Sequence, residues 1–137
     1  MAEKHPFVEL SDLIEEYKEQ RLSFDADKLQ DMRERISLCL FLMSDSASKA
    51  LSQQEAADFN RKRNYAERLD YWKSEINETT NKPYTVAAAE AKSRIDNKDF
   101  EEKYVEATRK QQRVRIILDS TKHIINSIAS RLNNVSR

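Results

Sequence analysis

The sequence predicts an all-α protein: a long, coiled-coil-like helical hairpin with a short N-terminal helix and a short middle helix. Composition supports this fold class, because the 137 residues include no glycine and two prolines, and 35% of them are charged. The mean hydropathy of −0.85 is typical of long solvent-exposed helices. Apolar residues also recur at helical or heptad spacing along most of the chain. The length is that of a single helical domain, 1–137.

The absence of glycine excludes several kinds of functional site. Phosphate-binding P-loops, dinucleotide-binding GxGxxG turns, nucleophile elbows and tight primed β-hairpins each need glycine where the backbone takes a positive φ or approaches a ligand closely. Cys39 is the single cysteine and lies in an apolar run, so we expect it to be a small core residue. No apolar run reaches the roughly 18 residues of a membrane span. We therefore expect a cytoplasmic protein without membrane contact.

The first two helices are expected over 7–20 and 26–76. The first has apolar residues on one face and follows Pro6, whose missing N–H costs nothing at a helix start. Asp25 or Asp27 can cap the second helix. Its apolar positions advance by alternating fours and threes, which is the heptad period of a helix that faces a partner along its length. Residues 38–43 are apolar on all sides, so we expect this turn to be buried on several sides.

The rest of the chain is expected to contain a loop and two helices. Residues 77–84 form a polar loop that ends near Pro83. Thr85 can cap a short helix over 85–96, and Asp96-Asn97 offers a fresh N-cap for a last helix over 97–134. That helix keeps the heptad step throughout. Two long heptad helices on so few residues leave apolar surface uncovered, so we expect a homo-oligomer; a monomer whose last helix packs on the first is the alternative.

Charge is divided along the sequence although the net charge is zero. Residues 1–60 carry 13 acidic and 7 basic residues, whereas residues 61–137 carry 11 acidic and 17 basic ones. A basic half suits a polyanion, and an acidic half suits a basic partner or the basic half of another copy. Chance segregation on solvated helix faces is the alternative.

Catalytic groups are sparse. His123 lies one helical turn after Asp119, a spacing more typical of a surface hydrogen bond than of a catalytic dyad. Neither HExxH nor a paired Glu-x-x-His motif of a bundle metal site occurs. We therefore predict that the protein is not an enzyme and binds no metal or other cofactor.

A nucleic-acid-binding interpretation is stronger, because cations and aromatic residues are interleaved between residues 61 and 73. Cations neutralise phosphates, and aromatic rings stack on bases of any identity, so this combination is typical of single-strand binding. The heptad seam places Tyr65 and Trp72 in the helix interface, whereas Tyr71 lies off the seam and is the better stacking candidate. The predicted nucleic-acid-binding residues are Arg61, Lys62, Arg63, Arg68, Tyr71, Lys73, Lys92 and Arg94.

Several segments resemble, in order and spacing, the UvsY recombination mediators of T-even-like phages. They are Leu10-Ser-Asp-Leu-Ile-Glu-Glu-Tyr-Lys18, Asp25-Ala-Asp-Lys-Leu-Gln30, Arg68-Leu-Asp-Tyr71, Ile117-Leu-Asp119 and Ile128-Ala-Ser-Arg131. The resemblance implies a non-catalytic DNA-recombination and repair protein that binds single-stranded DNA as a ring-shaped oligomer, in the host cytoplasm if a phage encodes it. It also implies two protein partners, a RecA/UvsX-like recombinase and the single-strand-binding protein that this recombinase replaces.

The family's DNA-binding stretch, Lys-x-Arg-Leu-Asp-Tyr, matches here at Arg68-Leu-Asp-Tyr71, but Ala66 stands in the position of the lysine. Lys62 and Arg63 lie about one turn earlier and can supply the missing charge. The alternative function is a structural or adaptor coiled coil with no nucleic-acid role. It accounts for the heptads equally well, but not for the shared location of cations and aromatic residues.

Overall fold

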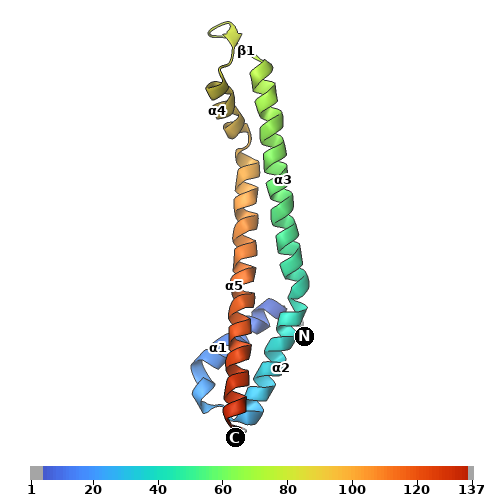
Figure 1. The fold of residues 1–137 in the computed structure, drawn as a ribbon, viewed down its shortest axis with the longest axis vertical. Coiled ribbons are helices and arrows are strands. Elements are labelled where there is room, and N and C mark those ends of the chain that lie inside the picture. The colour runs from blue at the N-terminus through green and yellow to red at the C-terminus, as the bar shows by residue number, and fades with distance from the viewer. Residues whose placement is uncertain (1–4, 136–137) are drawn as a thin grey trace. The chain divides into compact units, whose positions relative to one another are not determined.

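The computed structural model describes residues 5–135, which are helical almost throughout (Figure 1). In chain order the elements are α1 (Pro6–Gln20), the 3-10 turn η1 (Arg21–Ser23), α2 (Ala26–Leu42), α3 (Ser44–Ser74), β1 (Ile76–Asn77), β2 (Lys82–Pro83), α4 (Val86–Asp96) and α5 (Lys98–Val135). The two short strands pair with each other, and the described residues contain no sheet core. The all-α prediction is therefore confirmed. None of the described helices is long and apolar enough to cross a membrane.

The chain divides into two compact units. Residues 1–49 and 112–137 form one, which we call the terminal unit, and residues 50–111 form the other, the hairpin unit. The sequence segments of opposite charge are largely combined within the terminal unit. Residues 1–49 have 11 acidic and 7 basic residues, while residues 112–137 have 1 and 5, so their net charges of −4 and +4 cancel. The hairpin unit has 12 of each sign.

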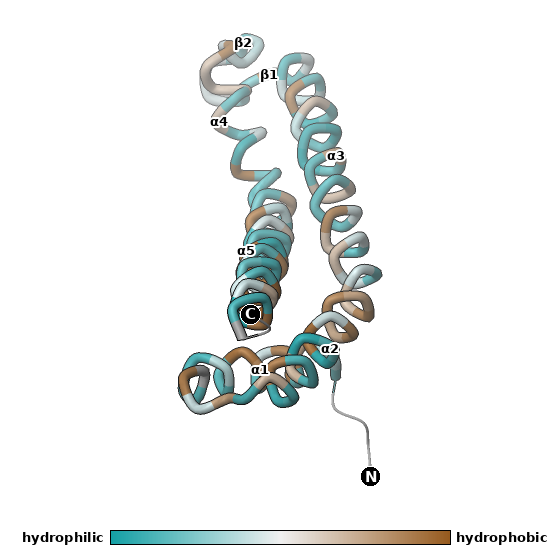
Figure 2. The backbone as a smooth tube through the Cα atoms, turned by 60° about the horizontal axis from the view of Figure 1, so that its bottom comes forward, coloured by the Kyte–Doolittle hydropathy of each residue, from teal (hydrophilic) through white to brown (hydrophobic). Residues whose placement is uncertain are grey.

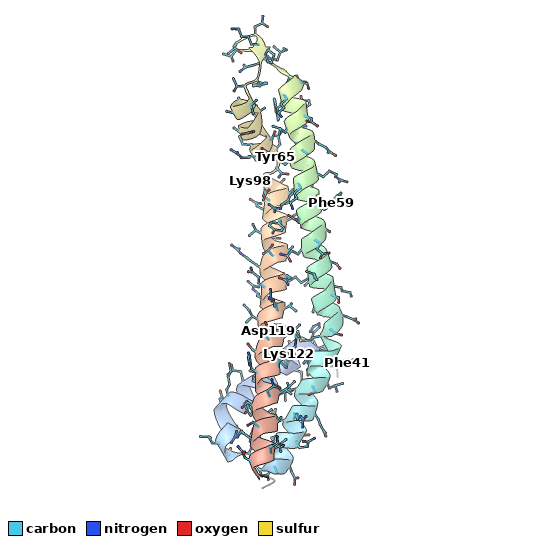
Figure 3. The ribbon with its side chains drawn as sticks, viewed as in Figure 1. Phe41, Phe59, Tyr65, Lys98, Asp119 and Lys122 are labelled. Atoms are coloured by element: carbon cyan, nitrogen blue, oxygen red, sulfur yellow. The ribbon has the colours of Figure 1, made fainter. Side chains whose placement is uncertain are left out.

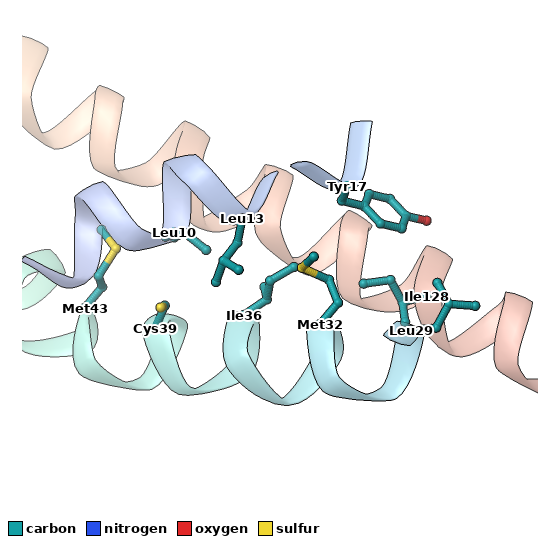
Figure 4. Close-up of a cluster of buried hydrophobic side chains, with 9 residues drawn as sticks. All are labelled: Leu10, Leu13, Tyr17, Leu29, Met32, Ile36, Cys39, Met43 and Ile128. Atoms are coloured by element: carbon teal, nitrogen blue, oxygen red, sulfur yellow. The ribbon is translucent and has the colours of Figure 1, made fainter. Parts of the chain in front are cut away.

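An apolar core holds the terminal unit together. Apolar side chains recur on one face of α1 and meet the matching face of α2, and Ile128 of α5 joins them (Figure 4). The buried members are Leu10, Leu13, Tyr17, Leu29, Met32, Ile36, Cys39, Met43 and Ile128. Tyr17 satisfies its hydroxyl by a 2.8 Å hydrogen bond with Ser127 Oγ. The prediction that Cys39 is a core residue is confirmed, and burial raises the pKa of its thiol, which keeps it protonated.

The helix expected over 26–76 is divided at Met43. Asp25 caps its start as expected, since its Oδ1 accepts a 2.8 Å hydrogen bond from the Lys28 N–H. At the division, the Ser44 hydroxyl donates to the Phe41 carbonyl at 2.8 Å. Serine side chains compete in this way for backbone partners and bend helices. The Met43 side chain is 1% exposed in the terminal core. The break thus falls where the core-facing residues of α2 end.

The expected burial of residues 38–43 on several sides is wrong for three of the six. Cys39 and Met43 are buried, but Leu38, Phe41 and Leu42 are 58%, 73% and 50% exposed. Phe41 projects from the outer side of α2 (Figure 3). The cause is geometric, because the core contacts of α2 all lie on the face that carries Ile36, Cys39 and Met43. The opposite face is left as an exposed apolar patch, the α2 patch, formed by Leu38, Phe41 and Leu42.

Polar side chains join the helices of the hairpin unit. Gln54 Nε2 donates to Thr108 Oγ1 at 3.2 Å, and Asn64 Nδ2 donates to Asn97 Oδ1 at 2.8 Å. The partner of residue 54 is residue 108, and the partner of residue 64 is residue 97. Because the partner's number falls as the number on α3 rises, α3 and α5 run antiparallel. Within residues 50–111, the fully buried side chains are small or polar: Ala50, Ala89, Ser93 and Asn97. Figure 2 colours the chain by hydropathy, with brown hydrophobic segments along α1 and α2 and a mostly teal α3.

The helix expected to reach residue 76 ends at Ser74, and Ile76 is instead the first residue of a short antiparallel pairing. In this pairing Ile76 lies opposite Pro83 and Asn77 opposite Lys82, and the two strands enclose the expected loop. The Asn77 carbonyl accepts from the Asn81 N–H at 2.7 Å, which closes the turn. Asn81 has a φ of 55°, the left-handed conformation that asparagine tolerates better than most residues. An asparagine therefore serves where a glycine is common. Thr85 caps α4 as expected, because its Oγ1 accepts from the Ala88 N–H at 3.2 Å.

Two apolar positions of the terminal unit test its core. We expect Ile36→Ala to lower the free energy of unfolding by about 2–5 kcal/mol, because Ile36 is fully buried and its truncation leaves a cavity. Leu22→Ala is the control, since Leu22 is 87% exposed and lies outside the α2 patch; its effect should stay within about 0.5 kcal/mol. Urea unfolding followed by circular dichroism measures both, and equal losses would contradict the described core.

Candidate nucleic-acid interface

The eight residues predicted to bind nucleic acid all lie in the hairpin unit, six on α3 and two on α4. The structure brings six of them together in two groups. Arg68, Tyr71 and Lys92 gather around Trp72, and Arg61, Lys62 and Arg94 line a cavity at the junction of α4 and α5. The other two residues lie in neither group. Arg63 lies over the Phe59 ring at 5.6 Å and 3.9 Å from Glu67, and Lys73 is exposed near the end of α3.

Stacked cations and aromatic rings form the first group, which we call the Trp72 cluster: Arg68, Tyr71, Trp72, Tyr84 and Lys92. Trp72 makes edge-on contacts with both tyrosines, with ring centroids 5.1 and 5.5 Å apart. Lys92 Nζ lies 4.7 Å from the Trp72 ring centre and 5.2 Å from that of Tyr84. The Arg68 guanidinium lies 4.3 Å from the Tyr71 ring. These distances are those of cation–π pairs.

Asp96 fixes the Trp72 cluster from α4. One carboxylate oxygen of Asp96 accepts from Trp72 Nε1 at 2.7 Å and from Arg68 Nε at 2.8 Å. These hydrogen bonds, that of Trp72 first and that of Arg68 second, hold the pKa of the Asp96 carboxyl below its ordinary value. The carboxylate therefore stays charged at neutral pH and neutralises part of the positive charge of Arg68.

Tyr71 offers the most accessible aromatic surface of the Trp72 cluster. It is 43% exposed, whereas Trp72 and Tyr84 are half-buried between the elements. This agrees with the heptad pattern, which places Trp72 on the seam and Tyr71 beside it. Tyr65, the other aromatic residue of the predicted seam, is also half-buried.

The second group is organised by Arg61. Its guanidinium forms a 2.7 Å ion pair with Asp58 and a 3.3 Å ion pair with Glu101, and lies 3.8 Å from the Tyr104 ring centre. Lys62 also pairs with Asp58, at 2.9 Å. The hydrogen bonds from Lys62, and then from Arg61, lower the pKa of the Asp58 carboxyl. Arg61 therefore joins α3 to α5 and is less available to a ligand than the sequence suggests.

Asn97 lies at the centre of the α4–α5 junction. Its side chain is 1% exposed, accepts from Asn64 Nδ2 at 2.8 Å and donates to Glu101 Oε1 at 3.2 Å. The sequence predicts a side-chain N-cap for α5 here. The structure differs, because the Asn97 backbone is helical, with φ −91° and ψ 0°, and its side chain bonds across to α3. Asn97, which directly follows α4, thus connects α3 and α5 through its side-chain amide.

A cavity of about 510 Å³ opens at this junction. Its lining combines cations, an aromatic ring, an amide and one carboxylate, supplied by Arg61, Lys62, Tyr65, Arg94, Asn97 and Glu101. Figure 3 labels Tyr65 on α3 and Lys98 at the start of α5, which mark the region. Lys62 and Arg94 extend into solvent at its edge, with side chains 69% and 70% exposed. The volume lies within the usual range of ligand pockets.

Sequence reasoning missed the partners that hold these cations. Asp58 lies four residues before Lys62, so the helical i, i+4 rule could have identified it. Asp96 and Glu101 lie 28 and 40 residues from the arginines that they bind, and no local pattern connects them.

Comparisons with protein-family models, curated proteins and solved structures found no match to this chain.

Asp96 gives the hairpin unit a testable dependence on pH. Because its pKa is lowered in the folded protein, its stabilising contribution is present above the ordinary value of 3.8 and is lost as pH falls through the folded-state value. We expect Asp96→Asn to destabilise the protein at pH 7 and the difference from wild type to shrink below about pH 4. Thermal unfolding at pH 7, 5 and 3.5 measures this. Asp70→Asn, an exposed site on α3, is the control, and a difference that grows on acidification would contradict the assignment.

Proposed function

We propose that this protein binds single-stranded DNA through the hairpin unit and that the Trp72 cluster is the main contact. The observation that carries the proposal is the juxtaposition of exposed Tyr71 with the Arg68 guanidinium and of Lys92 with two further rings. Such a surface offers a base a stacking partner and offers the adjacent phosphate a cation, without reading base identity. Lys73 is also exposed near the end of α3 but lies outside this cluster.

The ion pairs within the hairpin unit are compatible with this role. Arg68 and Lys62 each have a carboxylate partner at 2.8–2.9 Å, yet their side chains remain 35% and 69% exposed. Ion pairs at exposed positions contribute only about 0–1 kcal/mol. A phosphate can therefore share or replace a carboxylate at small cost. The hairpin unit has no net charge, so its local groups of cations, and not its overall charge, would attract the phosphates.

We propose further that the protein acts as a homo-oligomer. The α2 patch supports this, because three large apolar side chains that are at least half exposed lie together on one helix. Burying them against another copy would place several DNA-binding units in one assembly. Linked weak sites raise the apparent affinity by about 10²–10⁴ when they engage together. The family resemblance adds that such an assembly forms a ring.

The resemblance to UvsY mediators leads us to propose a role in recombination. In this role the oligomer holds single-stranded DNA while a RecA/UvsX-like recombinase replaces single-strand-binding protein. Two residues of the matching Arg68-Leu-Asp-Tyr71 stretch, Arg68 and Tyr71, contact each other in the Trp72 cluster. The shared stretch and the cation–aromatic surface therefore coincide, although Ala66 replaces the family's lysine.

Tyr71→Leu tests the DNA-binding proposal. We expect it to weaken binding of a fluorescent single-stranded oligonucleotide about tenfold, because one stacked base contributes roughly 1–3 kcal/mol. Wild-type affinity should also fall steeply as salt rises. Fluorescence anisotropy across a salt series measures both. Phe59→Leu is the matched control, since Phe59 is a 62% exposed aromatic residue on α3 outside the cluster. No wild-type binding at low salt would overturn the proposal and favour the scaffold alternative.

The same variants test mediation when recombinase assembly is followed on DNA covered by single-strand-binding protein. Wild type and Phe59→Leu should shorten the lag before assembly, and Tyr71→Leu should not. A wild-type protein that binds DNA yet leaves the lag unchanged would overturn the mediator role and leave DNA binding intact.

Phe41→Arg tests the oligomer. A charge in the centre of the α2 patch should lower the molecular mass in solution, because an unpaired charge is costly to bury between subunits. Light scattering coupled to size-exclusion chromatography measures the mass, with Leu22→Arg, an 87% exposed site outside the patch, as control. A wild-type protein that is monomeric at micromolar concentration would contradict self-association.

A further inference from the structure

The cavity at the α4–α5 junction has features that the Trp72 cluster lacks. It is a concave space of about 510 Å³, and its lining belongs wholly to the hairpin unit. Tyr65 supplies an aromatic ring to the wall, and the buried amide of Asn97 supplies a polar group. The two most exposed lining side chains, Lys62 and Arg94, are both cations. A planar ring can thus be accommodated inside, with an anion at the edge.

The only carboxylate in the lining is already engaged. Glu101 accepts from Asn97 through Oε1 and from Arg61 through Oε2, so its charge is balanced within the protein. Arg94 has a weaker tie, a 3.8 Å contact with Glu90 on its own helix. The lining itself carries three cations and one anion. The carboxylates that pair with Lys62 and Arg94, namely Asp58 and Glu90, do not line the cavity. Exposed ion pairs of this kind contribute only about 0–1 kcal/mol, so a phosphate at the edge can replace these partners.

We infer that this cavity takes one nucleotide of the bound strand, with its base against Tyr65 and its phosphate between Lys62 and Arg94. The inference rests on the proposed single-strand binding and adds a second, concave subsite to the open Trp72 cluster. A free phosphate would use only the cations, and an apolar ligand only the ring. A nucleotide uses both, because its planar base and its phosphate are joined through the sugar.

Comparing a normal oligonucleotide with an abasic one of equal length tests the base contact. We expect Tyr65→Leu to weaken binding of the normal strand about tenfold, the scale of one lost stacking contact. Binding of the abasic strand should change less than twofold. Tyr65→Phe keeps the ring and should match wild type on both strands. A misfolded variant would lose binding of both strands together, so the abasic strand serves as a control for folding.

Arg94→Gln tests the phosphate contact at a position too exposed to affect folding. It should weaken binding of both strands about threefold. It should also reduce by about one the slope of log affinity against log salt concentration. Lys98→Gln is the control, since Lys98 is a 75% exposed cation at the same junction and does not line the cavity.

The outcomes separate the two proposals. Wild-type binding of the normal strand with unchanged binding by Tyr65→Leu, or with unchanged binding by Arg94→Gln, overturns the nucleotide subsite and leaves single-strand binding intact. Failure of the wild-type protein to bind either strand overturns the proposed function itself.

Discussion

The buried amide of Asn97 is the contact on which the organisation of the hairpin unit depends. It lies where α4 ends and α5 begins, and it bonds to Asn64 of α3 and Glu101 of α5. A buried amide without partners would cost about 1–3 kcal/mol, so these bonds fix which residues of α3 lie opposite the junction. Glu101 then holds Arg61, and the turn before Asn97 presents Asp96 to Arg68 and Trp72. The cavity and the Trp72 cluster both follow from this alignment.

The two units are stabilised in different ways. The terminal unit buries leucine, isoleucine and methionine side chains, which stabilise it without regard to direction. The hairpin unit buries only small or polar side chains completely and relies on directional bonds and cation–π pairs. Directional contacts specify register more than they contribute free energy. A surface built on them keeps cations and rings in defined positions, which suits a proposed role in contacting a flexible strand.

Much of the fold was predictable because its causes are local. Helical spacing, the Asp25 and Thr85 caps and the polar loop each depend on residues within one or two turns, and each occurs where the sequence predicts it. The break at Met43 and the exposure of Phe41 were not predictable. Both depend on which face of α2 meets α1 and α5, and an apolar run with no polar side gives no indication of that face.

The sequence by itself determined that the chain is helical, that cations and aromatic residues alternate on α3, and that Tyr71 stands off the heptad seam. Only the tertiary structure decided that Asp96 holds Arg68 and that Glu101 holds Arg61, because these partners are 28 and 40 residues apart. The pair of Lys62 with Asp58 follows from helical spacing alone. The tertiary structure also decided that the acidic and basic segments of the sequence neutralise each other. Opposite charges that are segregated along the sequence are combined within the terminal unit, since folding brings residues 1–49 and 112–137 together. Charge pairing follows distance in space, which the order of residues does not contain.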